Sequence, residues 1–239
     1  VSALKGVGPQ LEGKLASLGV HSVIDLLFHL PIRYQDRTTT LAIGELRSGS
    51  EVLISGRIEA SGVQFGRRRS LITVISDDTG RLTVRQFHFN ASQRRGLKRG
   101  AFIQCYGEVR SGPTGLEMVH PEYRLIEGPD AVEVETTLTP VYPTTEGIGQ
   151  RRWRDLTGQA LARCGEAAPE LLGDWAGFEF SDLPLSEALT QLHRPPAGVD
   201  LQTLKAGTHP AQQRLAFEEL LANHLAVRRR RERRDALSA

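Results

Sequence analysis

The stretch that decides the fold is SLITVISDDTGRLTVRQFHF, residues 70–89. Its two halves, Ser70–Ser76 and Arg81–Phe89, are rich in β-branched residues, and the DTG tripeptide between them is a turn signal. Strand alternation in the second half places Leu82 and Val84 on one face. The other face holds Arg81, Thr83, Arg85, Phe87 and Phe89. The stretch therefore predicts a β-hairpin with one buried and one exposed face.

Further strands are predicted on both sides of this hairpin, at Glu51–Ser61, Ala101–Arg110 and Leu116–His120. Residues 91–99 predict a short helix between the third and fourth strands. Five strands with a helix at that place are the order of an OB-fold, a partly open barrel that binds nucleic acid on its strand 2–3 face. We therefore expect an α+β protein built around a five-stranded OB-fold β-barrel.

Helices are expected on either side of the barrel. Before it, residues 9–18 and 21–30 predict a helical hairpin, with Gly19 as a stop and Ser22 as an N-cap. After it, the predicted helices are residues 151–164, 185–192 and 209–234. The expected organisation is an N-terminal helical segment, the barrel, an extended connector with short helices, and a long final helix, at residues 1–49, 50–128, 129–199 and 200–239.

Charge is distributed unevenly along the 239 residues. The barrel segment carries a net +4 and the connector a net −6, and 26 of the 30 cations are arginine. A polyanionic partner should prefer the basic blocks, and arginine suits phosphate binding and base stacking. With 39% hydrophobic and 24% charged residues the chain can bury a core, which excludes a disordered tail.

Several other classes of protein are disfavoured. No apolar run approaches a membrane span, no export leader opens the sequence, and Cys105 and Cys164 stand far apart without a CxxC pattern. We expect a cytoplasmic protein with no metal site and no membrane association. The seven histidines form no metal-binding pair, and the carboxylates of Asp77 and Asp78 fit a hairpin turn better than a metal site, so no catalytic residue is predicted.

The N-terminal glycines need separate treatment. Residues 8–15 (GPQLEGKL) match G-x-x-x-x-G-K, but leucine follows Lys14 where a phosphate-binding loop needs serine or threonine, and Lys14 falls within a predicted helix. A nucleotide site is therefore not expected. Residues 4–9 (LKGVGP) resemble the turn of a helix-hairpin-helix motif, whose backbone N–H groups face a DNA phosphate. The alternative is that these glycines only allow two helices to pack closely.

The candidate nucleic-acid site surrounds the end of the third strand. An exposed aromatic ring beside Arg85 is what base stacking requires, and basic loops border the same face. The predicted binding residues are Phe87, Phe89, Arg85, Arg67, Arg68, Arg69, Arg94, Arg95 and Lys98. The alternative is a β-bulge after Arg85 that reverses the register and buries both phenylalanines. The arginine run at residues 228–234 is a weaker candidate, because charged helix ends are usually only solvated.

Seven stretches, in order along the chain, resemble the N-terminal wedge region of bacterial RecG-type branch-migration DNA helicases. They are LKGVGP (4–9), DLLFHLPIRYQDR (25–37), ISDDTGRLTVRQFHF (75–89), MVHPEY (118–123), LTPVYPTTEG (138–147), LHRPP (192–196) and HPAQQR (209–214). The resemblance implies a wedge that binds forked or branched DNA, including Holliday junctions, while a motor absent from this chain uses ATP and Mg²⁺. It also implies that Phe87, and secondarily Phe89, stacks on unpaired bases. Family members often carry an aromatic where this chain has Gln86, so one stacking surface is missing or shifted.

The resemblance further implies a role in replication-fork reversal, recombination and repair within the bacterial nucleoid. The expected partners are branched DNA and the motor domains of the same polypeptide, and we expect a monomer. This segment alone is expected to hydrolyse nothing and to need no cofactor. Two other functions remain open at this point: a general single-stranded DNA-binding OB module, and a protein-interaction adaptor built on the acidic connector and the final helix.

Overall fold

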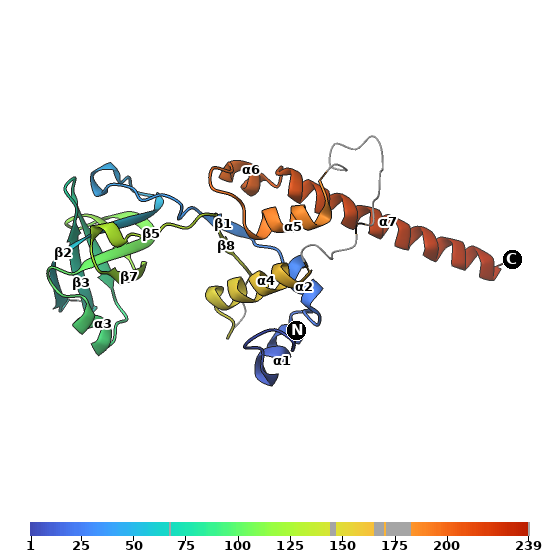
Figure 1. Cartoon of the computed structure of the whole chain (residues 1–239), viewed down its shortest axis with the longest axis horizontal. Coiled ribbons are helices and arrows are strands. Elements are labelled where there is room, and N and C mark those ends of the chain that lie inside the picture. The colour runs from blue at the N-terminus through green and yellow to red at the C-terminus, as the bar shows by residue number, and fades with distance from the viewer. Residues whose placement is uncertain (67, 144–146, 165–169, 171–182, 239) are drawn as a thin grey trace. The chain divides into compact units, whose positions relative to one another are not determined.

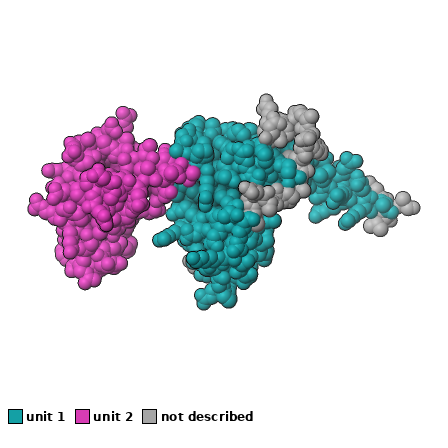
Figure 2. Space-filling model, viewed as in Figure 1, with its two compact units in different colours: residues 1–34, 139–239 teal, residues 35–138 magenta. Residues whose placement is uncertain are grey.

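A computed structural model describes residues 1–66, 68–143, 147–164, 170 and 183–238. The chain divides into two compact units, shown in Figure 2. Unit 1 comprises Val1–Tyr34 and Thr139–Ala239, and unit 2 comprises Gln35–Leu138. The α+β class is confirmed, since unit 2 carries the large sheet and unit 1 most of the helices (Figure 1). The chain segments that precede and follow unit 2 in the sequence thus form one compact unit. The sequence predicts four consecutive segments instead.

Unit 2 contains a six-stranded sheet, one strand more than expected. Its strands are β2 (Glu51–Gln64), β3 (Ser70–Ser76), β4 (Arg81–Gln86), β5 (Phe102–Gly112), β6 (Gly115–Val119) and β7 (Glu122–Ile126). Neighbouring strands are antiparallel except β4 and β6, which are parallel. The order is β2-β3-β4-β6-β5-β7, and β2 also pairs with β5. The pairings β2-β3-β4-β6-β5-β2 therefore form a closed ring, and β7 is added along β5.

The core of unit 2 fills the inside of this ring of strands. Leu82 and Val84 are buried there, as the alternation predicted. In β2 the register shifts between Ile58 and Ala60, so Ile58 points inward before the bulge and Ser61 and Val63 do so after it. The helix α3 (Ala91–Gly96) follows β4, and Leu97 at its end joins the same core.

The turn between β3 and β4 is built around the Asp77 carboxylate. It accepts hydrogen bonds from the backbone N–H groups of Thr79 and Gly80 in the turn, and from Ile43 in the short 3₁₀ helix Ile43–Glu45, each at 2.8 Å. Partial burial favours the protonated acid, but these hydrogen bonds outweigh it and lower the pKa of Asp77 below its usual value. The predicted turn role of this carboxylate is confirmed.

Unit 1 is mainly helical. Its helices are α1 (Pro9–Ser17), α2 (Val23–Phe28), α4 (Gln150–Cys164), α5 (Leu185–His193), α6 (Leu201–Ala206) and α7 (Pro210–Ser238). The predicted Ser22 cap is present as a full capping box with Asp25 at the start of α2. None of the described helices has the length and apolarity that crossing a bilayer demands.

An extended connector is expected after the sheet, at residues 129–149. The structure instead contains a 3₁₀ turn and a strand in this segment. Pro129–Ala131 is a 3₁₀ turn, and β8 (Thr139–Val141) pairs with β1 (Arg33–Gln35) in a two-stranded sheet. All three residues of β8 are buried, and so is the Tyr142 side chain that follows. The burial of β8 depends on its pairing with β1, which short-range periodicity does not reveal.

The N-terminal glycine turn packs on α4. The carbonyl of Gly6 accepts a hydrogen bond from Arg152, and the Lys5 backbone N–H donates to Gln159 Oε1 at 2.7 Å. The N–H of Val7 bonds within the turn, to Leu4. A Cβ at Gly6 would meet the Arg152 guanidinium, so close packing on α4 accounts for this glycine.

A buried polar network joins α2, α4 and α5. His193 Nε2 lies 2.8 Å from the Leu27 carbonyl, which can only accept, so Nε2 carries the proton. His193 Nδ1 then accepts from the Tyr142 hydroxyl at 2.8 Å, and Thr157 contacts the same hydroxyl at 3.0 Å. Burial disfavours the imidazolium and lowers the pKa of His193 to about 4, from an ordinary 6.5.

This network predicts that unit 1 loses stability in mild acid. The folded state keeps His193 neutral down to about pH 4, whereas the unfolded chain takes up a proton below about pH 6.5. Stability is therefore complete above pH 6.5 and falls by roughly 3 kcal/mol as the pH drops to 4. Urea unfolding followed by tryptophan fluorescence reports unit 1, because residues 35–138 contain no tryptophan. In the non-titrating variant His193→Gln, the free energy of unfolding should change less steeply with pH between 4 and 6.5. An equal pH dependence in both proteins would contradict the lowered pKa of His193.

Candidate nucleic-acid interface

A groove of about 1180 Å³ lies on the outer face of β2, β3 and β4. Its lining combines small, polar and apolar residues with arginines. The lining residues that carry the argument below are Gly62, Arg68, Ile72, Arg81, Arg85 and Phe87. Among the described residues that line it there are three arginines and no acidic side chain.

Strand register explains why this face is hollow. Gly62 on β2 pairs with Ile72 on β3, which pairs with Arg85 on β4, so these residues form one row across the outer face. A parallel row joins Ala60, Val74 and Thr83. Because β2 contributes only small residues to both rows, the face is concave beside the taller side chains of β3 and β4. The bulge in β2 is what turns these small residues outward.

Phe87 lies at the edge of this groove, outside the core. The strand β4 ends at Gln86 without a register shift, so the bulge considered after Arg85 is absent. The Phe87 side chain is half-buried and lines the groove beside Arg85. The phenylalanine predicted from the sequence as the main stacking residue is thus part of the groove lining and not of the core.

The arginines of the groove differ in how firmly they are held. Arg85 is largely buried and forms an ion pair with Glu117, with Nε and Oε2 2.9 Å apart. Arg68, at the margin, is exposed. The ion pair with Glu117 offsets part of the charge of Arg85 and fixes the position of its side chain. The exposed Arg68 side chain is accessible to an anion from solution.

Phe89 lies in surroundings different from those that strand alternation predicted. Its ring packs against the hydrophobic core of unit 2, and the Arg69 guanidinium lies over it, 4.8 Å from the ring centroid. The alternation that placed Phe89 beside Phe87 ends with the strand at Gln86, and the bend that follows redirects the chain. Phe89 and Arg69 therefore form a cation–π pair with each other.

The basic residues around α3 do not line the groove, contrary to expectation. Arg94, Arg95 and Lys98 are exposed on and after α3. Leu97 anchors this helix in the core, and Gly96 lies against Leu125 of β7. The strand β7 pairs with β5 and contributes no residue to the groove. These cations therefore lie outside the groove lining. Arg67 lies outside the described residues.

Two features of the interface were not assigned from the sequence. Gln86 points inward, because it pairs with the core residue Leu71, so an aromatic at this position would face the interior. Phe65, in the loop between β2 and β3, is 81% exposed and precedes the groove residue Gly66. The signal for Phe65 was its place in a predicted loop before three arginines.

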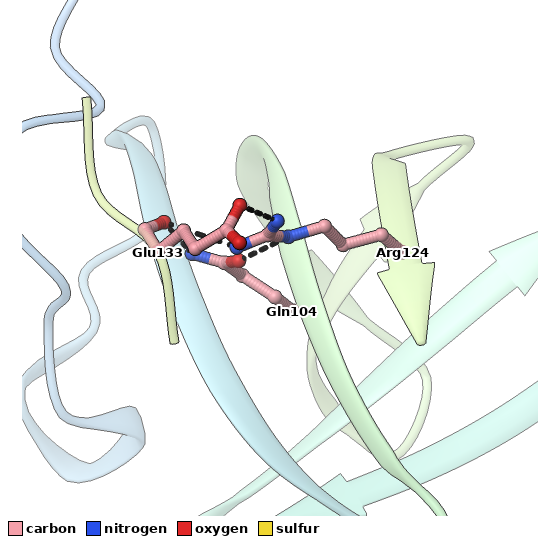
Figure 3. Close-up of polar contacts among 3 residues, drawn as sticks. All are labelled: Gln104, Arg124 and Glu133. Carbon is pink, nitrogen blue, oxygen red and sulfur yellow. Dashed lines mark hydrogen bonds and ion pairs between the residues drawn. The ribbon is translucent and has the colours of Figure 1, made fainter. Parts of the chain in front are cut away.

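A second hollow of about 320 Å³ lies beside β5 and β7, and its polar groups are engaged with one another. As Figure 3 shows, Arg124 donates to Gln104 Oε1 at 2.6 Å and forms an ion pair with Glu133. The Gln104 amide donates to the Glu133 carbonyl at 2.7 Å. The cluster holds Glu133 against β5 and β7, so we assign it a structural role.

The residues considered for other chemistry lie in structural surroundings. The described residues contain no group of three or more His, Cys, Asp or Glu side chains that could hold a metal ion. Burial raises the pKa of the Cys105 thiol to about 12, which makes it a poor nucleophile. Gly8 is the N-cap of α1, and turns rather than a strand precede it within residues 1–7, so residues 8–15 do not have the strand-loop-helix form of a phosphate-binding loop.

Comparison with known proteins agrees with this geometry. The family model described as the RecG wedge domain matches residues 1–163. The chain is 46% identical over 228 residues to the ATP-dependent DNA helicase RecG of Escherichia coli K12, covering 95% of this chain and 33% of that protein. It is 44% identical over 236 residues to its namesake in Pasteurella multocida, covering 96% of this chain and 33% of that protein.

A solved structure, described as RecG bound to a three-way DNA junction, superimposes with a TM-score of 0.68 at 26% identity. It covers 98% of this chain and 31% of that chain. The chain thus spans about a third of the length of the relatives it matches. Since the family model covers more than half of the residues, including the whole of unit 2, the chain belongs to the RecG wedge domain family.

Proposed function

We propose that this chain is the fork- and junction-binding wedge of a RecG-type ATP-dependent DNA helicase. In this role it splits strands at branched DNA during replication-fork reversal, recombination and repair. The single observation that carries the proposal is the groove on β2, β3 and β4, which Phe87 and three arginines line without an acidic side chain among the described residues. Closed strand pairing supports a finer proposal, that the ring of five strands is an OB-fold barrel.

The wedge acts passively. Exposed arginines such as Arg68 neutralise phosphates close to the branch point and orient the DNA. Phe87 then replaces the stacking partner that a base loses when its pair opens, which offsets about 1–3 kcal/mol of the cost of separation. Neither contact reads base edges, so binding should depend on DNA structure far more than on sequence. The work of translocation, with ATP and Mg²⁺, belongs to the motor implied by the relatives.

A titration of three DNA substrates tests this function. The chain should bind a forked duplex more tightly than a single strand or a blunt duplex of equal length, in fluorescence anisotropy at fixed salt. Equal affinity for fork and single strand would instead support a general single-strand binder. Absence of DNA binding at low salt would support the protein-interaction adaptor and would refute the proposal.

The salt dependence of fork binding should report Arg68. Because each neutralised phosphate releases counterions, Arg68→Ala should reduce the slope of log affinity against log salt by about one. Arg163→Ala, an exposed arginine on α4 outside the groove and outside the 228–234 run, is the matched control and should leave the slope unchanged. Equal reductions in both variants would show that the cations act non-specifically and that the groove is not the binding site.

A further inference from the structure

The turn between β6 and β7 holds a strained residue next to the proposed stacking ring. Within the described residues, His120 is the one non-glycine residue with positive φ, at 51°. Side chains disfavour this region, and such outliers persist only where the surrounding structure enforces them. The strain at His120 therefore needs a compensating interaction, and its contacts show which one.

Those contacts are with the segment that carries Phe87. The backbone N–H of Phe87 donates to His120 Nε2 at 3.1 Å, and the His120 N–H donates to the Arg85 carbonyl at 2.9 Å. The His120 ring also lies against the rings of Phe87 and His88, with centroids 5.7 Å away in each case. One residue thus binds the chain on both sides of Gln86, where β4 ends.

The hydrogen bond fixes the state of the imidazole. Since Nε2 accepts from a backbone N–H, the neutral ring carries its proton on Nδ1. The bond also satisfies the Phe87 N–H, a backbone donor just past the end of β4, where pairing with β3 has stopped. Without it, the Phe87 N–H at this bend would lose the partner that ties it to the β6–β7 turn.

We infer that His120 is a positioning residue for DNA stacking: it accepts the Phe87 N–H and so holds the Phe87 ring at the groove edge. The inference rests on the proposed function, because it assigns His120 no contact with DNA and lets it act only through Phe87. Preorganisation of this kind raises affinity by removing the cost of ordering the ring when the base arrives.

Two substitutions separate the acceptor from the ring. His120→Phe keeps an aromatic ring but offers no acceptor, whereas His120→Gln keeps an acceptor oxygen on a chain of similar reach. We expect His120→Phe to weaken fork binding roughly three- to tenfold, a part of the full stacking contribution, and His120→Gln to stay within about twofold of the parent. If His120→Phe fails to fold, His120→Ala takes its place with the same expected direction.

A double-mutant cycle with Phe87→Ala decides whether His120 acts through the ring. In the Phe87→Ala background, His120→Phe should have no further effect on fork affinity. A 2-aminopurine base at the branch point gives a second readout, since stacking quenches its fluorescence, and His120→Phe should lose part of that quenching while His120→Gln retains it.

The outcomes separate the inference from the function beneath it. If Phe87→Ala itself leaves fork binding unchanged, the stacking role fails and the inference fails with it. If Phe87→Ala weakens binding but His120→Phe does not, or does so equally in both backgrounds, His120 is not a positioning residue and the proposed function stands. Equal loss in His120→Phe and His120→Gln also overturns the inference, because the acceptor would then be irrelevant.

Discussion

Phe87→Ala should weaken binding to forked DNA roughly five- to 150-fold, the equivalent of the 1–3 kcal/mol that an aromatic ring contributes per stacked base. The ring lines the groove beside Arg85 and is absent from the hydrophobic core, so its removal should leave thermal unfolding nearly unchanged. Affinity for a blunt duplex should change little, because no unpaired base is present to stack. Anisotropy titrations at fixed salt measure both substrates.

Two other phenylalanines provide controls. Phe28, half-exposed on α2 in unit 1, lies outside the groove, so Phe28→Ala should bind forks like the parent. Phe89→Ala should lower the unfolding temperature, since this ring packs on the core. The stacking role would be refuted if Phe87→Ala unfolded unit 2, because the ring would then belong to the core. It would also be refuted if the folded variant bound forks with the affinity of the parent.

Arg214→Met should destabilise unit 1 by roughly 3–5 kcal/mol, the cost typical of removing one partner from a buried ion pair. The Arg214 side chain is only 1% exposed, and its guanidinium lies 2.6 Å from a carboxylate oxygen of Glu170 and 2.6 Å from one of Glu218. It also donates to the Leu183 carbonyl at 3.1 Å. Without the cation, the carboxylate of Glu218 is left largely buried without its counter-charge.

The same helix supplies the matched control for this variant. Arg228 and Glu232 form another pair four residues apart on α7, but the Arg228 side chain is 69% exposed. Arg228→Met should therefore cost no more than about 1 kcal/mol, as exposed pairs do. Tryptophan-detected urea unfolding of both variants measures the contrast. Similar stabilities would mean that water or relaxation compensates for the buried charge, contrary to the geometry.

The position of Arg214 differs from what its sequence suggests. It begins an arginine-rich helix in which the apolar residues Leu220, Leu225 and Val227 are exposed, whereas Arg214 is buried. Helical periodicity counts only which side chains are apolar. It cannot locate Glu170, which comes from a distant part of the chain and supplies a second counter-charge besides Glu218.

Local signals were sufficient wherever the interaction that fixes an element is itself short-range. The capping box of Ser22 and Asp25, the turn at Asp77 and the burial of Leu82 and Val84 all follow from contacts within a few residues or from strand alternation. These elements could be predicted because the partners are adjacent in sequence, and the order of strands then indicated the α+β class.

The sequence by itself determined the five principal strands, the main helices and the choice of Phe87 as the stacking candidate. Only the tertiary structure decided that Phe89 packs against the core and that the α3 cations lie outside the groove lining. It also decided that the Phe87 N–H donates to His120. The reason is physical: alternation is valid only while a strand continues, and β4 ends at Gln86. Beyond that residue, side-chain directions are set by contacts with residues distant in sequence, such as the β6–β7 turn, and no local pattern encodes them.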